Sequence, residues 1–292
     1  MSQPTIEEFA NTAGGAAFYR AYDTILARWP DGTTSFDVES RHGRTRINAY
    51  GPPDAPPVVL LPGGGATSTA WFANVAALGA RHRVHAVDIL GDAGRSVVGP
   101  RPPRDVDDLL DWFLAVVDGL GLETFAAVGH SYGAMIALAA ALRFPERFGK
   151  LVLLDPNSCF AGMRPGYLLH ALPVLLRPNE DRERAFVAWE TGGRGPDEEW
   201  LDLLALAATF PTSKTIVPKR PPARAFRDFH VATTVILARD SKVHDSTRVE
   251  RAVRQVLPDA RTVVLDDATH HTLPLHPADA VNAALLEGLG TA

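Results

Sequence analysis

The chain has 292 residues, of which 46% are hydrophobic and 22% are charged, with 34 acidic against 29 basic side chains. A chain of this length forms two domains or one large α/β unit, and either can bury a sizeable core. The net charge of −5 is not concentrated in a basic cluster, which disfavours a nucleic-acid partner. The single cysteine, Cys159, excludes an intramolecular disulfide and a cysteine-rich zinc site.

The composition of the N-terminal segment bears on localisation. The first thirty residues lack the basic stretch followed by an apolar stretch that marks a signal peptide. No run approaches the roughly eighteen apolar residues that a membrane span needs. The sequence therefore predicts a cytoplasmic monomer or homodimer without a membrane partner. No His, Asp or Glu cluster has ligand spacing, so we expect no metal and no other cofactor.

The N-terminal segment is expected to be helical up to about Arg28. Thr5 and Glu8 have the spacing of a capping box, in which a hydroxyl and a carboxylate accept backbone N–H groups at a helix start. Two short alternating runs follow, at 35–39 and 45–50. The turn residues between these runs indicate a β-hairpin.

From residue 58 onwards, short apolar runs alternate with helical segments, a pattern typical of parallel strands buried on both faces. The rhythm lapses between 157 and 230, where Pro, Arg and aromatic residues are frequent and helices are expected near 182–189 and 198–209. Strands are predicted at 58–61, 84–87, 125–128, 151–154, 234–238 and 262–265, and helices at 105–120, 134–142, 247–257 and 278–289.

The lapse predicts a helical cap inserted after the strand that ends at Leu154. The expected division is an N-terminal helical extension of residues 1–30, an α/β core of residues 31–156 and 231–292, and a cap, or lid, of residues 157–230.

The motif Gly129-His130-Ser131-Tyr132-Gly133 carries the chemistry of this sequence. It matches Gly-x-Ser-x-Gly and lies directly between a predicted buried strand and a helix rich in small residues. A serine on such a turn is held with its hydroxyl exposed at the helix N-terminus, and the flanking glycines leave room for the sharp turn. We therefore predict that Ser131 is a catalytic nucleophile.

A serine hydroxyl needs a base to remove its proton, so a histidine is expected on a later loop. His270 and His271 follow the last predicted strand. The His-x6-Pro spacing from His270 to Pro277 favours His270 as the base, with His271 as the alternative. His130, inside the motif, is expected to pack beneath the serine.

A carboxylate must orient the histidine and stabilise its protonated form. It is expected on the loop after the strand at 234–238, where the usual position falls near Ser241. Asp240 comes about one residue early and Asp245 about four residues late. Asp245 also fits as the N-cap of the next helix. Asp155, which follows the preceding strand, is a third candidate.

The charge that develops on an attacked carbonyl needs fixed donors, which backbone N–H groups supply. Tyr132 follows the nucleophile, and Gly64 lies on the glycine-rich loop after the first buried strand, so these two residues are predicted to form an oxyanion hole. Such a loop could also cradle phosphates, but no Gly-Lys-Ser/Thr follows it and no Gly-x-Gly-x-x-Gly opens a helix. A nucleotide site is therefore a weaker alternative.

These motifs resemble the α/β-hydrolase superfamily over nearly the whole chain, which implies a mostly parallel central sheet flanked by helices. More narrowly, the chain resembles bacterial carboxylesterases that hydrolyse arylpropionate esters. That resemblance implies an aspartate in the register of Asp245, so Asp245 is the first choice of acid and Asp240 the alternative. The chain differs from many members in having Pro62 before Gly63 instead of a histidine. The segments that carry the narrower resemblance are 21–23, 29–30, 51–57, 68–71 and 87–92.

Together, these features predict a serine carboxylesterase-like α/β hydrolase that cleaves a small apolar or aromatic ester through an acyl-enzyme. The alternatives are a lactone or thioester hydrolase, a cyclase of a biosynthetic pathway, a C–C bond hydrolase or lyase on the same fold, and a slow, ligand-sensing receptor. Ser131 argues against the dehalogenases of the superfamily, which need an aspartate as nucleophile.

Overall fold

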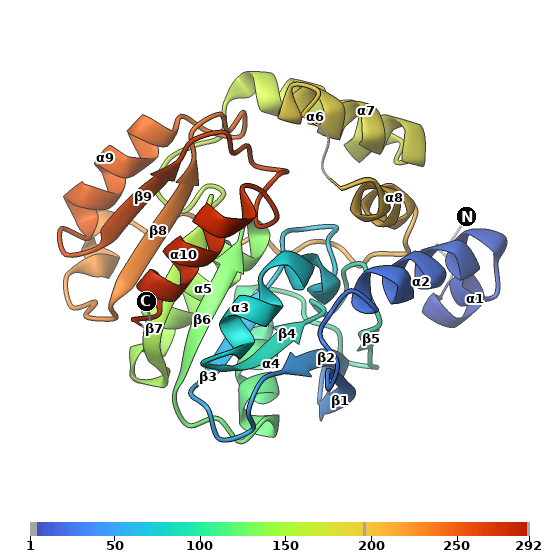
Figure 1. Cartoon of the computed structure of the whole chain (residues 1–292), viewed down its shortest axis with the longest axis horizontal. Coiled ribbons are helices and arrows are strands. Elements are labelled where there is room, and N and C mark those ends of the chain that lie inside the picture. The colour runs from blue at the N-terminus through green and yellow to red at the C-terminus, as the bar shows by residue number, and fades with distance from the viewer. Residues whose placement is uncertain (1–4, 195–196, 291–292) are drawn as a thin grey trace.

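A mixed β-sheet runs through the centre of the protein in a computed structural model that describes residues 5–194 and 197–290 (Figure 1). The described strands are β1 (Thr34–Ser40), β2 (Gly43–Tyr50), β3 (Pro57–Leu61), β4 (Arg83–Val87), β5 (Val97–Val98), β6 (Phe125–His130), β7 (Phe148–Leu154), β8 (Thr233–Ala238) and β9 (Arg261–Leu265). Their order is β1-β2-β4-β3-β6-β7-β8-β9, with β5 beside β2. The predicted hairpin is the antiparallel pair β1–β2, and β2 is also antiparallel to β4. The strands from β4 through β3 to β9 pair in parallel, which confirms the expected mostly parallel sheet.

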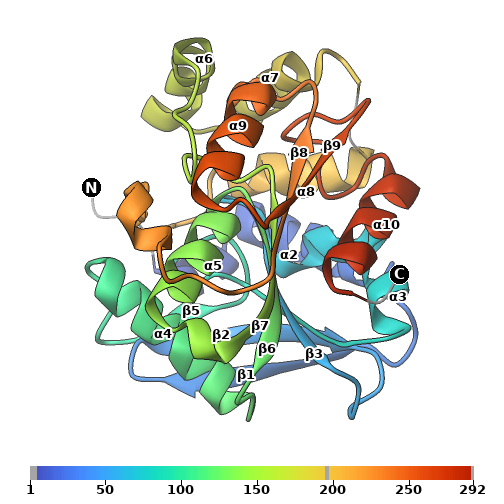
Figure 2. The same ribbon diagram turned by 90° about the vertical axis from the view of Figure 1, so that its left-hand side faces the viewer.

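Helices cover both faces of the sheet, which is seen edge-on between them in Figure 2. Helices α3 (Val75–Gly79) and α10 (Ala278–Gly288) pack on one face. Helices α4 (Val106–Gly119), α5 (Tyr132–Arg143) and α9 (Ser246–Val256) pack on the other. The side chains of the central strands are buried on both faces, which explains why those strands read as unbroken apolar runs.

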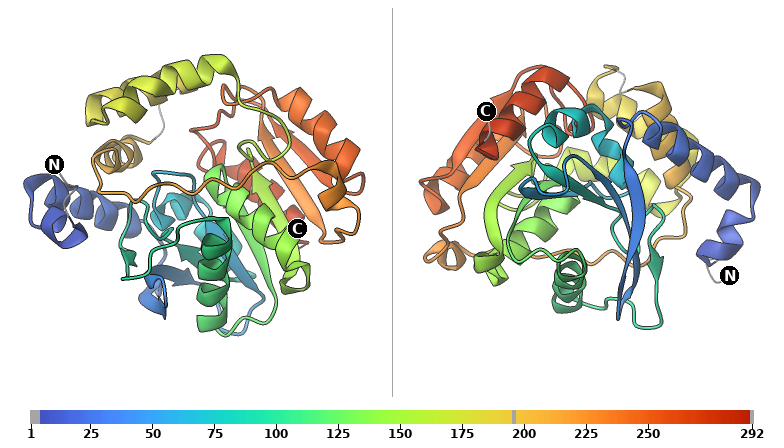
Figure 3. Two further views of the ribbon diagram at one scale, coloured as in Figure 1. Left: turned by 180° about the vertical axis from the view of Figure 1, so that it is seen from behind. Right: turned by 60° about the horizontal axis from the view of Figure 1, so that its bottom comes forward.

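The N-terminal extension consists of α1 (Ile6–Ala10) and α2 (Ala13–Leu26). The predicted capping box is present, because the Glu8 N–H donates to Thr5 Oγ1 and the Thr5 N–H donates to Glu8 Oε2. Helix α2 packs beside the helix of residues 198–207, drawn in gold in Figure 3, and α1 packs against α2. The ring of Phe18 on α2 is fully buried and lies 5.0 Å from that of Phe210.

Between β7 and β8, the described residues form three α-helices that lie over the carboxyl ends of the parallel strands (Figure 1). Helices α7 (Glu180–Thr191) and α8 (Glu198–Ala207) contain the two helical stretches predicted in this region. Helix α6 (Pro165–Leu176) was not predicted. Among its residues only Ala171 is buried, and five of its leucines are exposed, so its sequence has no amphipathic period that would indicate a helix.

The remaining elements are short 3-10 turns: η1 (Ser68–Ala73), η2 (Pro145–Arg147) and η3 (Ala223–Phe226). Together with α3 and β5, they are too short to give a hydrophobic period, so sequence patterns could not place them. Among the described residues, no helix has both the length and the apolar character needed to cross a bilayer.

Candidate active site

Ser131 occupies a strained turn between β6 and α5. Its φ of 51° and ψ of −111° place a non-glycine residue in a region that side chains rarely adopt. Its N–H donates to the Leu154 carbonyl, which fixes the turn against the next strand. The hydroxyl therefore projects at the start of α5, as the motif predicts.

The two flanking glycines are required by close backbone packing. A Cβ on Gly129 would lie 2.5 Å from the Gly133 carbonyl oxygen, and one on Gly133 would lie 2.3 Å from the Leu61 carbonyl oxygen. Real Cβ atoms do not make such contacts. The two glycines of the motif are therefore required because β3, β6 and α5 pack closely together, and this packing holds Ser131 at the turn.

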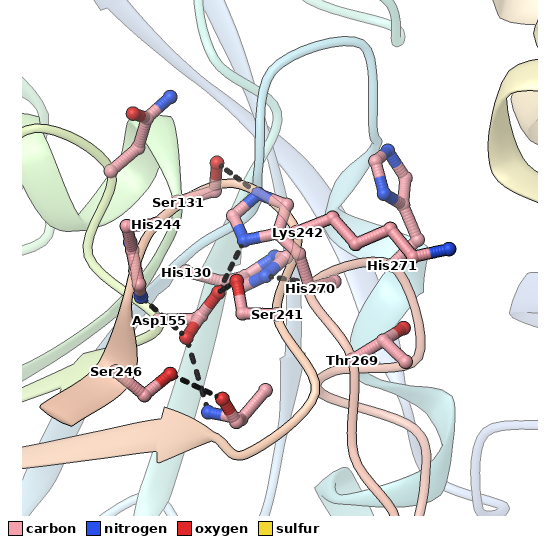
Figure 4. Close-up of polar contacts among 12 residues, drawn as sticks. His130, Ser131, Asp155, Ser241, Lys242, His244, Ser246, Thr269, His270 and His271 are labelled. Atoms are coloured by element: carbon pink, nitrogen blue, oxygen red, sulfur yellow. Dashed lines mark hydrogen bonds and ion pairs between the residues drawn. The ribbon is translucent and has the colours of Figure 1, made fainter. Parts of the chain in front are cut away.

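The structure brings His270 to Ser131, with His270 Nε2 2.8 Å from Ser131 Oγ (Figure 4). On the other side of the ring, His270 Nδ1 lies 2.7 Å from Oδ2 of Asp155. The three residues follow the ends of β6, β9 and β7, so the carboxyl edge of the sheet gathers them from distant parts of the chain. Both Ser131 and His270 are almost completely buried, at 7% and 4% exposure.

Asp155 is fully buried and receives further polar contacts besides the one from His270. Its Oδ1 accepts the Ala238 N–H at 3.1 Å and lies 3.0 Å from His244 Nε2, while its Oδ2 accepts the Ser241 hydroxyl at 2.7 Å. Burial acts to raise the pKa of this carboxyl, but His244 and His270 hold the pKa well below its usual range. Asp155 is therefore ionised beside His270.

The expectation that Asp245 or Asp240 pairs with the histidine is wrong. Asp245 Oδ1 accepts the Arg248 N–H at 3.0 Å and caps α9, with the side chain about half exposed. Asp240 pairs with Arg194 at 2.7 Å on the surface. The loop after β8 turns Ser241 and His244 inward instead, and these two residues contact Asp155.

The other two histidines considered as site residues lie close to His270 without contacting the serine hydroxyl. His130 Nε2 lies 3.1 Å from the His270 carbonyl oxygen, and burial lowers the pKa of His130 to about 3, so this ring is neutral and donates there. Its ring packs against the loop that carries His270. His271 points toward α7, where its Nδ1 is 3.3 Å from Glu190 Oε2.

The glycine-rich loop after β3 lies against the serine turn. A Cβ built on Gly63 would be 3.5 Å from Ser131 Cβ, and one on Gly64 would be 3.6 Å from Tyr132 Cβ. In this fully described region, neither the Gly64 N–H nor the Tyr132 N–H donates to another protein atom. Two available backbone donors therefore lie side by side near Ser131.

A buried carboxylate supports this loop. Asp92 Oδ2 accepts the Gly65 N–H at 3.0 Å, and its Oδ1 accepts the Ala93 N–H at 2.8 Å. Burial raises the pKa of Asp92 to about 6, in opposition to these bonds. The Pro62-Gly63 sequence thus relies on Asp92 to hold the following turn.

Sequence reasoning missed Ser241 and His244 as site residues. A signal for Ser241 was present, because a serine stands where the loop after β8 usually carries the acid. A hydroxyl there cannot orient an imidazolium by charge, so the acid had to come from another strand. His244 gave no comparable signal, because its contact with Asp155 depends on how the loop folds.

Comparisons with known proteins agree with this architecture. A model of the alpha/beta hydrolase family matches residues 58–284. Carboxylesterase YbfK of Bacillus subtilis is 35% identical over 185 residues, which span 63% of this chain and 61% of that protein. The uncharacterized carboxylesterase nap of the same organism is 28% identical over 279 residues, or 88% of this chain and 87% of that one.

Two solved structures from Bacillus subtilis superpose over nearly the full length. Carboxylesterase CesB (YbfK) has a TM-score of 0.88 at 26% identity and covers 96% of this chain and 100% of its own. Naproxen esterase (carboxylesterase NP) also has a TM-score of 0.88 at 26% identity, covering 95% and 99%. Both bear out the resemblance to bacterial carboxylesterases, and the second, named for its action on naproxen, matches the narrower resemblance.

The family match covers more than half of the sequence, so the chain belongs to the α/β-hydrolase family. Its similarity to carboxylesterases in both sequence and structure identifies it further as an enzyme of the hydrolase class.

Proposed function

We propose that the protein is a serine carboxylesterase in which Ser131 is the nucleophile and His270 is the general base. Asp155 is the ionised carboxylate that orients His270. The observation that supports this assignment is the continuous contact from Ser131 Oγ through the His270 ring to Asp155 Oδ2, with distances of 2.8 Å and 2.7 Å. With Asp155 ionised, His270 Nδ1–H donates to it and Nε2 accepts the serine proton.

The proposed reaction proceeds in two halves. Ser131 Oγ attacks the ester carbonyl while His270 Nε2 takes the hydroxyl proton, and the resulting oxyanion is bound by the Gly64 and Tyr132 N–H groups. The C–O bond to the alcohol breaks, and His270 returns the proton to the leaving alkoxide. Water then attacks the acyl-enzyme through the same base, which releases the carboxylic acid and restores Ser131.

Substrate access requires the cap to move. Ser131 and His270 are nearly covered, and the ring of Tyr167 on α6 lies 6.3 Å from the His270 ring, edge-on to it. The cavity beside Tyr132, which Asp92 and Ile216 also line, has a volume of about 30 Å³, and neither Ser131 nor His270 lines it. We therefore infer that residues 157–230 act as a cap over a core of residues 31–156 and 231–292, with residues 1–30 as an extension that packs against the cap.

We propose small aryl esters as the substrate class, with arylpropionate esters as the first compounds to assay. The support is the likeness to naproxen esterase over nearly the whole chain. Aromatic side chains of the cap surround the covered site: Tyr167 packs against Phe186 and Trp189, with ring centroids 5.3 Å and 6.3 Å apart. Such surfaces suit an apolar acyl or alcohol group.

The test compares the wild type with Ser131→Ala on a p-nitrophenyl ester of a short acid and on the corresponding thioester. We expect Ser131→Ala to lower kcat by about 10³-fold or more. A fluorophosphonate should label the wild type at one serine and leave Ser131→Ala unlabelled. Unchanged ester turnover in Ser131→Ala would refute the proposal, and faster thioester than ester turnover would redirect the substrate class.

A further inference from the structure

Glu190 is a buried carboxylate that the proposed reaction does not use. It lies near the end of α7, in the cap, and has no exposed surface. Charged side chains are rarely buried completely unless they are paired or hydrogen-bonded. The partners of Glu190 are therefore informative about its role.

Among the described residues, all polar contacts of its carboxylate go to the loops after β8 and β9. Glu190 Oε1 accepts the Lys242 N–H at 3.1 Å and the His270 N–H at 3.2 Å. Glu190 Oε2 accepts the His271 N–H at 3.1 Å and lies 3.3 Å from His271 Nδ1. One carboxylate from the cap thus joins the loop after β8 to the loop after β9, and one of its bonds is to the backbone of His270 itself.

These donors compensate the buried charge. Burial acts to raise the pKa of Glu190, but the contacts with His271 and His270 lower it to about 2. The carboxylate is ionised throughout the neutral range, so a second anion besides Asp155 lies close to the catalytic imidazole.

We propose that Glu190 is a positioning residue of the esterase: it fixes the backbone of His270, and its negative charge stabilises the imidazolium that His270 forms when it takes the Ser131 proton. This inference rests on the function proposed above. Its first half follows from the hydrogen bond to the His270 N–H, which limits how far the ring can shift from Ser131 Oγ. Its second half follows from the burial of both Glu190 and His270, because charges interact more strongly away from water.

The location of Glu190 makes this alignment depend on the cap. The bonds exist only while α7 is seated on the two loops. Trp189, the residue before Glu190, strengthens the contact between α7 and the loop after β8. Lys242 Nζ donates to the Trp189 carbonyl and lies 4.8 Å from the Trp189 ring centre. A cap that opens to admit substrate releases His270 from Glu190, and a cap that closes restores the aligned base.

Other ionisable groups lie near His270 and Glu190, and their charges also affect the pH dependence of the activity. Those facing His270 come from the ends of β6, β7 and β9 and from α6, and those facing Glu190 come from α6 and the loop after β9. Glu183 on α7 also interacts with His271 electrostatically. The groups are His130, Asp155 with His244 behind it, Tyr167, His271 and Glu183.

The test is Glu190→Gln, with Glu183→Gln as a matched control on the same helix. Both variants replace a cap carboxylate by an amide, but among the described residues the Glu183 side chain makes no hydrogen bond to the loops of the site, and it is only partly buried. We expect Glu190→Gln to lower kcat/KM about 10- to 100-fold. We also expect the acid limb of the pH profile of kcat/KM, the rise on its acidic side, to move to lower pH by about half a unit, because the imidazolium loses a stabilising anion. Glu183→Gln should leave both quantities close to those of the wild type. A lower kcat/KM with an unmoved acid limb would overturn the electrostatic half of the proposal.

A second readout separates this inference from the esterase function. The pKa of His270, followed by NMR in the resting protein and assigned with His270→Asn, should fall by a similar amount in Glu190→Gln whether or not any ester is hydrolysed. An active wild type with unchanged kinetics and His270 pKa in Glu190→Gln would overturn the role of Glu190 alone. An inactive wild type with a shifted His270 pKa would overturn the esterase assignment alone.

Folding is the remaining concern for a buried position. If Glu190→Gln does not fold, Glu190→Asp keeps the charge and shortens the side chain, so we expect a lower kcat with an unshifted acid limb. Hydrogen exchange of the wild type needs no variant: the amides of Lys242, His270 and His271 should all be protected. Rapid exchange of the His270 amide in the native protein would contradict the proposed anchoring.

Discussion

His244 Nε2 lies 3.0 Å from Oδ1 of Asp155, so the carboxylate that contacts His270 is shared between two imidazoles. Both rings are almost completely buried, and Asp155 has no exposed surface. His244 comes from the loop after β8, the loop that usually supplies the acid in this fold. In this chain that loop instead supplies donors to an acid that follows β7.

The first prediction concerns the position of the acid. Asp155→Asn should lower kcat on an aryl ester by about 10³- to 10⁴-fold, because the amide can neither stabilise the imidazolium nor hold the required tautomer. Asp245→Asn and Asp240→Asn should retain nearly full kcat. Steady-state kinetics of the three variants would test this assignment. A comparable loss of kcat in Asp245→Asn would indicate that the carboxylate comes from the loop after β8.

The second prediction concerns the second histidine on Asp155. His244→Phe removes a donor from a buried anion, so we expect the free energy of unfolding near neutral pH to fall by about 1–3 kcal/mol. The pKa of Asp155 is depressed in the folded protein, so its contribution is present above its ordinary pKa of 3.8 and is lost as the pH falls below that value. Urea unfolding should therefore show the two proteins converging below about pH 4. A difference that stays constant with pH would contradict this explanation.

The third prediction concerns Asp92, which should make the free energy of unfolding depend on pH in the opposite direction from Asp155. Its pKa is raised to about 6 in the folded protein, against an ordinary value of 3.8. The folded state then binds the proton more tightly, so the contribution of Asp92 to stability grows as the pH falls from about 6 to about 4 and is constant outside that window. In Asp92→Asn this change is absent.

The measurement for Asp92 is the free energy of unfolding of both proteins across that window. The wild type should gain stability relative to Asp92→Asn on acidification. We also expect Asp92→Asn to lower kcat, because an amide cannot accept both the Gly65 and Ala93 N–H groups and the turn after Gly64 loosens. A parallel pH dependence in the two proteins would show that Asp92 titrates normally.

The fourth prediction tests the packing behind the serine turn. Gly129→Ala places a Cβ 2.5 Å from the Gly133 carbonyl oxygen, so we expect a loss of stability of about 3 kcal/mol or more, or no folded protein. Gly166→Ala on α6 is the control, since a Cβ there meets nothing within 4 Å. That substitution should raise stability by up to about 1 kcal/mol. Thermal unfolding of both variants would measure the contrast.

The sequence by itself determined the α/β architecture and two of the three residues in the line of contacts. The apolar runs fixed the parallel strands, because each is buried on both faces. The serine turn is a local structure whose glycines are required by neighbours within a few residues, so Ser131 could be found from a five-residue pattern. His270 followed from its place after the last strand and its spacing to Pro277.

Only the tertiary structure decided the carboxylate and its support. Asp155 and His270 are 115 residues apart, and their contact depends on the adjacent positions of β7, β8 and β9 and on the turn that directs Ser241 inward. Asp245 has the right type and nearly the right spacing, but its hydrogen bond to the start of α9 holds it at the surface. Glu190 lies on α7, and the sequence of that helix does not indicate which loops it will contact. Long-range contacts of this kind depend on how separate elements pack, which short sequence patterns do not encode.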